Sequence, residues 1–299
     1  MIIEKPVANI DDIPINVKKK NVPQSTNKSL PMLFNTQLYI GSKGTGKSYK
    51  LTKLLQLYEK SKIKDEDNVE YEMRTILISP TAHSGANEVY KTLSSLNQDD
   101  DVHLEYTDEL VLEILDDIKA KQKEYDEYLN YKKVYDKFMK VKSVDKLETD
   151  ELEVLEQNDY MPPKEVFGEI KPKINFLIFD DLIGMGAFNK KAKSVLSNLV
   201  IKHRHLKTNL IFTTQSYKQI PPVIRTNIDI YCIFRSSSYK EILDKIFEDV
   251  NGYVNIEDFI ELYEHATDEK NDCLTIINNS MDKRGVKFFK NWNIELLIK

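Results

Sequence analysis

The residues of this chain best suited to chemistry lie in one short loop, Gly41-Ser42-Lys43-Gly44-Thr45-Gly46-Lys47-Ser48. The loop matches G-x-x-x-x-G-K-[ST] at every fixed position, and in this pattern glycines let backbone N–H groups converge on phosphates. The lysine reaches the β- and γ-phosphates, and the following hydroxyl binds magnesium. We therefore predict that Gly41 to Tyr49 bind a nucleoside triphosphate, with Lys47 catalytic and Ser48 a magnesium ligand.

The residues on either side of this loop predict a strand before it and a helix after it, the context that the motif requires. Leu38-Tyr39-Ile40 is a short apolar run typical of a buried strand. After the loop, apolar side chains recur at helical spacing, at Leu51, Leu54, Leu55 and Tyr58. A glycine turn with an incidental lysine is the alternative, and this context disfavours it.

A phosphate loop requires a second magnesium ligand, an acid at the tip of a neighbouring apolar strand. The run Ile174–Phe179 ends at Asp180-Asp181. We predict that Asp180 binds magnesium and that Asp181 faces the γ-phosphate, where a carboxylate can orient or deprotonate the attacking water. Two acids at a strand end also serve as turn or cap residues, and the phosphate loop favours the catalytic interpretation.

Three further side chains are candidates for sensing or stabilising the γ-phosphate. Gln215 ends the apolar run that starts at Asn209, where its amide could contact a phosphate and a water. Arg204 lies just before that run, and there it could reach a neighbouring subunit's nucleotide as an arginine finger. Arg225 is the second candidate for the finger. A surface arginine that contacts solvent or DNA phosphate is the alternative interpretation for both.

Apolar runs alternate with helical patterns, which indicates an α/β fold with a mainly parallel sheet covered on both faces. The expected strands are residues 38–40, 75–79, 174–179, 209–215 and 228–234. Asn189 is expected to cap a helix that runs to His203. Residues 108–156 are expected to form one or two charged helices, whose tyrosines pack against the body of the protein rather than form a base-stacking platform.

Composition divides the chain into three parts. We predict a flexible N-terminal arm (1–30), an ATPase domain (31–250) with an acidic helical insertion (99–170), and a C-terminal extension packed on the core (251–299). The arm is rich in proline, asparagine and lysine, and it shows no clear period.

Charge is segregated along the chain, although the net charge is only -5. Residues 99–169 hold 22 acids and 10 lysines, whereas residues 182–228 hold no acid. The basic residues of that second stretch are Lys190, Lys191, Lys193, Lys202, Arg204, Lys207, Lys218 and Arg225. Such a stretch suits phosphate contacts, and a solvated basic face is the alternative. No apolar run approaches the roughly 20 residues needed to cross a bilayer. The start of the sequence lacks the basic-then-apolar layout of a secretion signal. The two cysteines, Cys232 and Cys273, match no metal-ligand spacing.

Several stretches together resemble the FtsK-HerA superfamily of DNA-pumping ATPases, and most closely the poxvirus-type genome-packaging ATPases of large DNA viruses. They are the phosphate loop, the strand ending at Asp181, the run His203–Gln215 and the segment Ile220–Asp229. The last two are the specific parts, and the resemblance covers residues 33–80 and 170–245. It implies a RecA-like core, a hexameric ring, ATP and Mg²⁺ as cofactors, Gln215 as sensor and Arg204 as a finger in trans. Cellular members usually carry glutamate where this chain has Asp181, which is one methylene shorter.

From these features we predict an ATP-driven translocase of double-stranded DNA that packages a viral genome. The resemblance places it in the host cytoplasm, where a capsid or inner-membrane protein at the packaging vertex would be its partner. A small-molecule kinase and a nucleotide-gated assembly scaffold are the alternatives. The first requires an acceptor site and a mobile lid, and the second would show slow or absent turnover.

Overall fold

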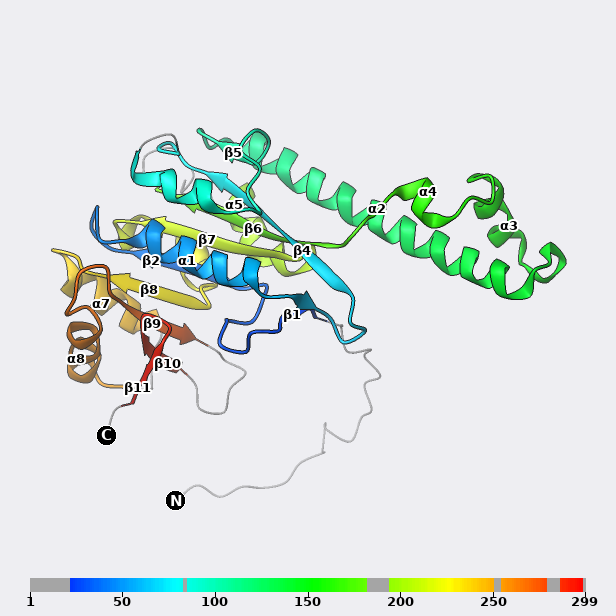
Figure 1. Ribbon diagram of the computed structural model, residues 1–299. Helices are drawn as coiled ribbons and strands as arrows, with labels where there is room; N and C mark the ends of the chain where they lie inside the picture. Colours follow the sequence, from blue (N-terminus) through cyan, green and yellow to red (C-terminus); the bar gives the residue numbers. More distant parts are fainter. Residues whose placement is uncertain (1–21, 83–84, 182–193, 250–253, 279–285, 298–299) are drawn as a thin grey trace, which may run out of the picture.

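The computed structural model describes residues 22–82, 85–181, 194–249, 254–278 and 286–297 (Figure 1). Within them, one sheet runs in the order β1-β3-β4-β6-β7-β2-β8-β9-β10-β11, and β5 pairs with β4. The five central strands, which are all parallel, are β4 (Glu70–Ile78), β6 (Lys173–Asp180), β7 (Thr208–Thr214), β2 (Thr36–Ile40) and β8 (Ile230–Phe234). The α/β class with a mainly parallel sheet is therefore confirmed.

The central strands are apolar nearly throughout because helices cover both faces of the sheet. Along β2, Leu38 and Ile40 pack into one hydrophobic core and Tyr39 into the other. The core on the Tyr39 side is closed by α1 (Lys47–Lys60) and the 3₁₀ helix η2 (Gly85–Thr92). The opposite core is closed by the start of α2 (Asp108–Val141) together with α5 (Val195–Lys202), α6 (Pro222–Arg225), α7 (Tyr239–Asp249) and α8 (Ile256–Ala266).

The expected elements are observed with shifted boundaries. The strand expected at residues 75–79 extends over nine residues as β4. Asn189, the expected helix cap, lies outside the described residues. Within them α5 begins at Val195, where the Ser194 side chain accepts a hydrogen bond from the Ser197 N–H and caps the helix.

The acidic insertion (99–170) forms a long helical arm, which is called the arm from here on and is distinct from the N-terminal segment 1–30. Near its start α2 packs into the core through Val111, Ile114 and Ile118, and the ion pair between Asp117 and Arg74 of β4 ties it to the sheet. Figure 1 shows the outer half of α2 extending from the sheet together with α3 (Thr149–Glu156) and α4 (Pro163–Phe167). Among the described helices, none is both long and apolar enough to cross a membrane.

The tyrosines of α2 are packed side chains, as expected, but several of them pack within the arm rather than against the body. Tyr131 is buried with Val134 and with Leu155 of α3. Its ring centroid lies 5.7 Å from that of Phe167 in α4. The apolar stripe of the outer half of α2 is therefore covered by the arm's own short helices.

Both ends of the described chain join the sheet. Near the start, β1 (Gln24–Ser25) pairs with β3 (Ile63–Lys64). After α8, β9 (Cys273–Asn278) pairs antiparallel with β8, and β10 (Val286–Lys290) and β11 (Ile294–Leu296) follow at the edge. The remaining short strand is β5 (Val102–His103). Residues beyond 250 thus extend the same sheet that carries the phosphate loop.

Candidate nucleotide site

The phosphate loop connects the end of β2 to the first turn of α1, and its glycines have identifiable roles. Gly44 (φ 76°) and Gly46 (φ 94°) adopt left-handed conformations that favour glycine. At Gly41, a Cβ atom would lie 2.6 Å from the Cβ of Phe234. The loop therefore depends on glycine both for its backbone path and for its close approach to the end of β8.

The Lys47 ammonium is hydrogen-bonded to the backbone at the start of its own loop. Its Nζ donates to the carbonyl oxygens of Gly41 (2.8 Å) and Ser42 (3.0 Å). Burial lowers the pKa of Lys47, while the nearby carboxylates of Asp181 and Asp180 oppose that shift. The structure thus brings together the predicted loop lysine and both predicted acids.

Asp180 is buried at the end of β6, and three hydroxyl groups hold its carboxylate. Oδ2 accepts from Ser79 (2.9 Å), and Oδ1 accepts from Thr213 (2.6 Å) and from Tyr90 (3.3 Å). The Tyr90 hydroxyl also lies close to the side chain of Ser48. Burial, with Asp180 nearby, raises the pKa of Tyr90, so this phenol stays protonated as a donor.

The oxygen atoms of Ser48 and Asp180 are suitable ligands for magnesium. Mg²⁺ is usually bound by one or two protein oxygens together with substrate phosphates. Ser48 offers a hydroxyl and Asp180 a carboxylate, while the described residues contain no cluster of three His, Cys, Asp or Glu side chains for a metal cage. Ser48 and Asp180 therefore fit a magnesium ion that is bound together with a nucleotide.

The predicted base and the predicted sensor are in direct contact. Asp181 adopts φ 49°, which is uncommon for a residue other than glycine, and its N–H donates to Thr213 Oγ1 (3.1 Å). The Gln215 amide donates to Asp181 Oδ2 (3.1 Å). Gln215 follows the last residue of β7, so two neighbouring strand ends position this pair.

The candidate arginines occupy other positions. Arg204 lies in the 3₁₀ helix η4 (His203–Leu206) before β7, where its 63% exposed side chain pairs with Asp229 at 3.0 Å. Seven residues of β7, or about 20 Å of strand, separate this edge of the sheet from the phosphate site. Arg225 instead packs its guanidinium on the Tyr217 ring, 5.4 Å from the centroid.

The remaining predicted residues are Tyr49, which directly follows Ser48 in α1, and three lysines of the basic stretch. Tyr49 is half exposed on α1, with the Lys53 ammonium over its ring. Lys190, Lys191 and Lys193 lie outside the described residues.

Three hydroxyl residues of the site were not identified from the sequence. Ser79 follows β4 and Thr213 lies near the end of β7, so a search for polar residues at strand ends would have found both. Tyr90 lies in η2, and its contact with Asp180 spans 90 positions. No local pattern indicates that contact.

Comparison with known proteins identifies the family. Residues 113–288, more than half of the chain, match the family described as poxvirus A32 protein. The chain belongs to the poxvirus A32 protein family. The match contains Asp180, Asp181 and Gln215, and it confirms the poxvirus-type resemblance. Together with the phosphate loop, this membership identifies the chain as a P-loop ATPase of viral type.

The solved structures that match this chain are distant in sequence. The genome packaging NTPase B204 from Sulfolobus turreted icosahedral virus 2, in complex with AMP, is 14% identical with a TM-score of 0.41, over 85% of this chain and 96% of that chain. The cytoplasmic domain of the Thermomonospora curvata type VII secretion ATPase EccC is 14% identical with a TM-score of 0.43, over 85% of this chain and 23% of that chain. A search of curated proteins gives no match.

The Tyr90 contact yields a prediction about magnesium. Tyr90→Phe removes the hydroxyl that donates to Asp180 and lies close to Ser48, so we expect the affinity of the ADP complex for Mg²⁺ to fall about 10- to 100-fold. Titration of Mn²⁺ into the protein–ADP complex, followed by electron paramagnetic resonance, measures this without turnover. Tyr131→Phe is the matched control, because it also removes one hydroxyl bond, to the Met161 carbonyl (2.6 Å), but in the arm. Equal metal affinity in the two variants would contradict the assignment.

Proposed function

We propose that this protein hydrolyses ATP to drive double-stranded DNA into a viral capsid. The observation that carries the proposal is the convergence of the phosphate loop, the Asp180-Asp181 pair and Gln215 at one edge of the sheet. Membership of the poxvirus A32 protein family supports this direction, because the sequence resembles poxvirus-type packaging ATPases in the segments that build this edge.

The proposed chemistry assigns a role to each side chain at this edge. Backbone N–H groups of the loop and Lys47 would hold the β- and γ-phosphates. Ser48 and Asp180 would hold Mg²⁺, whose charge would offset the negative charge on the phosphates. Asp181 orients or deprotonates the attacking water. Because Gln215 donates to the Asp181 carboxylate, a γ-phosphate that draws the amide away would change the position of the base.

The location of Arg204 supports action in trans. Its edge of the sheet lies about 20 Å from its own subunit's phosphates, which exceeds the reach of a side chain. It is exposed and held by a single carboxylate, that of Asp229. We propose a homo-oligomeric ring, a hexamer, in which Arg204 of one subunit completes the phosphate site of the next, with Arg225 as the second candidate.

The charge distribution supports separate partners for the arm and the body. An arm rich in acids repels DNA phosphates, whereas the exposed Lys202 and Lys218 of the body can contact them. We propose that DNA contacts the body of the ring. The arm would then be free to contact a capsid or inner-membrane protein at a packaging vertex in the host cytoplasm.

The first test of the function is the response of hydrolysis to DNA. We expect double-stranded DNA to raise the ATPase rate, and we expect the DNA affinity to fall steeply with salt because phosphate contacts release counterions. Phosphate release, followed with and without duplexes of unrelated sequence, measures this response. Phosphate transfer to a small acceptor without any DNA response would favour the kinase, and ATP binding without turnover would favour the scaffold.

The second test separates binding from chemistry. Lys47→Ala should abolish hydrolysis and weaken ATP binding, because the phosphates lose the positive charge that the loop lysine supplies. Asp181→Asn should leave binding nearly intact and slow turnover about 100-fold or more, because an amide cannot accept the water's proton. Calorimetry with ATP and single-turnover kinetics give the two quantities. If both variants lost binding equally, Asp181 would be a metal ligand rather than the base.

A further inference from the structure

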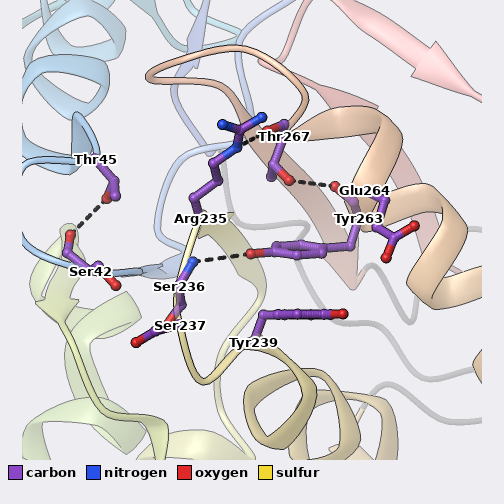
Figure 2. A pocket seen from close by; sticks show the side chains of 9 residues that line it. All are labelled: Ser42, Thr45, Arg235, Ser236, Ser237, Tyr239, Tyr263, Glu264 and Thr267. Atoms are coloured by element: carbon purple, nitrogen blue, oxygen red, sulfur yellow. Dashed lines mark hydrogen bonds between the residues drawn. The ribbon is translucent and has the colours of Figure 1, made fainter.

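A cavity of about 390 Å³ opens directly beside the phosphate loop. Ser42 and Thr45 of the loop line one side, and side chains from the segment after β8 and from α8 line the other (Figure 2). Its volume falls in the range of roughly 300–1,000 Å³ that is typical of small-molecule sites. The residues assigned to phosphate and magnesium chemistry leave most of this cavity without a role.

The far wall of the cavity is aromatic and fixed. Tyr263 is 4% exposed, and its hydroxyl accepts from the Ser236 N–H and donates to the Phe234 carbonyl, both at 3.2 Å. Tyr239 stacks on this ring, with centroids 5.3 Å apart and an angle of 12° between the planes. The two parallel rings in Figure 2 therefore form a platform whose orientation is set by backbone hydrogen bonds.

The platform and the phosphate loop are tied together through the end of β8. The Ser42 N–H donates to the Arg235 carbonyl at 3.0 Å. The Arg235 guanidinium donates to the carbonyl oxygens of Thr267 and Asp268, just after α8. The Tyr263 hydroxyl is hydrogen-bonded to Phe234 and Ser236, the residues on either side of Arg235. The distance between the loop and the aromatic wall is therefore fixed.

We propose that this cavity binds the base of the nucleotide whose phosphates the loop holds, with Tyr239 as the stacking residue. The inference rests on the proposed ATPase function. Every base presents a π-face, so stacking selects for a base without selecting strongly among bases. Glu264 is an exposed wall residue whose ionised carboxylate only accepts hydrogen bonds, so it suits the exocyclic amino group that adenine, guanine and cytosine carry. The site is therefore a base site of modest selectivity, in which ATP and GTP bind with affinities within about tenfold of each other.

The test compares ATP with a ligand that has no base. Loss of one stacked aromatic ring weakens binding by roughly 5- to 100-fold. We expect this loss for ATP in Tyr239→Ala, full retention in Tyr239→Phe, and an unchanged affinity of all three proteins for inorganic tripolyphosphate. Calorimetric titration of the full chain with each ligand, including GTP for the wild type, gives these affinities.

Each outcome of this titration has a distinct meaning. Unchanged ATP affinity in Tyr239→Ala would overturn the base site, as would an equal loss for tripolyphosphate, because Tyr239 would then only support the loop. A wild-type chain that binds neither ligand would overturn the ATPase function and the base site together. ATP binding by the wild type with no effect of Tyr239→Ala would overturn the base site alone.

Discussion

Parallel strands bring their carboxyl ends to one edge of a sheet, and the chemistry of this protein depends on that constraint. The register places Ile40 of β2 beside Thr214 of β7, and Thr213 beside Asp180 of β6. Three strand ends, at Ile40, Asp180 and Thr214, therefore supply the phosphate loop, the acids and the glutamine. A shift of one residue in either pairing would turn these side chains to the opposite face of the sheet.

A buried carboxylate must be paired or hydrogen-bonded, and Asp180 meets this requirement with hydroxyl groups. Ser79, Thr213 and Tyr90 occupy its oxygens from three different elements. Hydroxyl donors orient the carboxylate without neutralising it, so its charge remains available to a cation. The Lys47 ammonium lies near the carboxylates of Asp180 and Asp181. The charged groups of the site are therefore in position before the nucleotide enters.

Much of this edge could be predicted from the sequence because its signals are local. An apolar run followed by Gly41–Ser48, and another followed by Asp180-Asp181, predicts both strands and the residues at their tips. Tyr90 and the Tyr239–Tyr263 stack could not be predicted, since each depends on how separate elements pack in three dimensions. The tyrosines of α2 were expected to pack against the body, but the helix is longer than the core it meets. Several of them therefore have their partners in α3 and α4 rather than in the body.

The central strands have two ends, and the proposed motor uses residues at both of them. The phosphate site lies at the carboxyl ends of the strands, whereas Arg204 lies at the amino ends beside Asp229. One subunit cannot bring both to a single nucleotide, so a finger role for Arg204 requires the active site of an adjacent subunit. Mixing Arg204→Ala protein with Lys47→Ala protein and measuring ATP hydrolysis tests this role most directly. Each variant alone should hydrolyse ATP about 10³-fold more slowly than the wild type or not at all. The mixture should recover activity, because interfaces that pair an intact Lys47 with an intact Arg204 will form. No recovery, in assemblies shown by native mass to contain both variants, would contradict it.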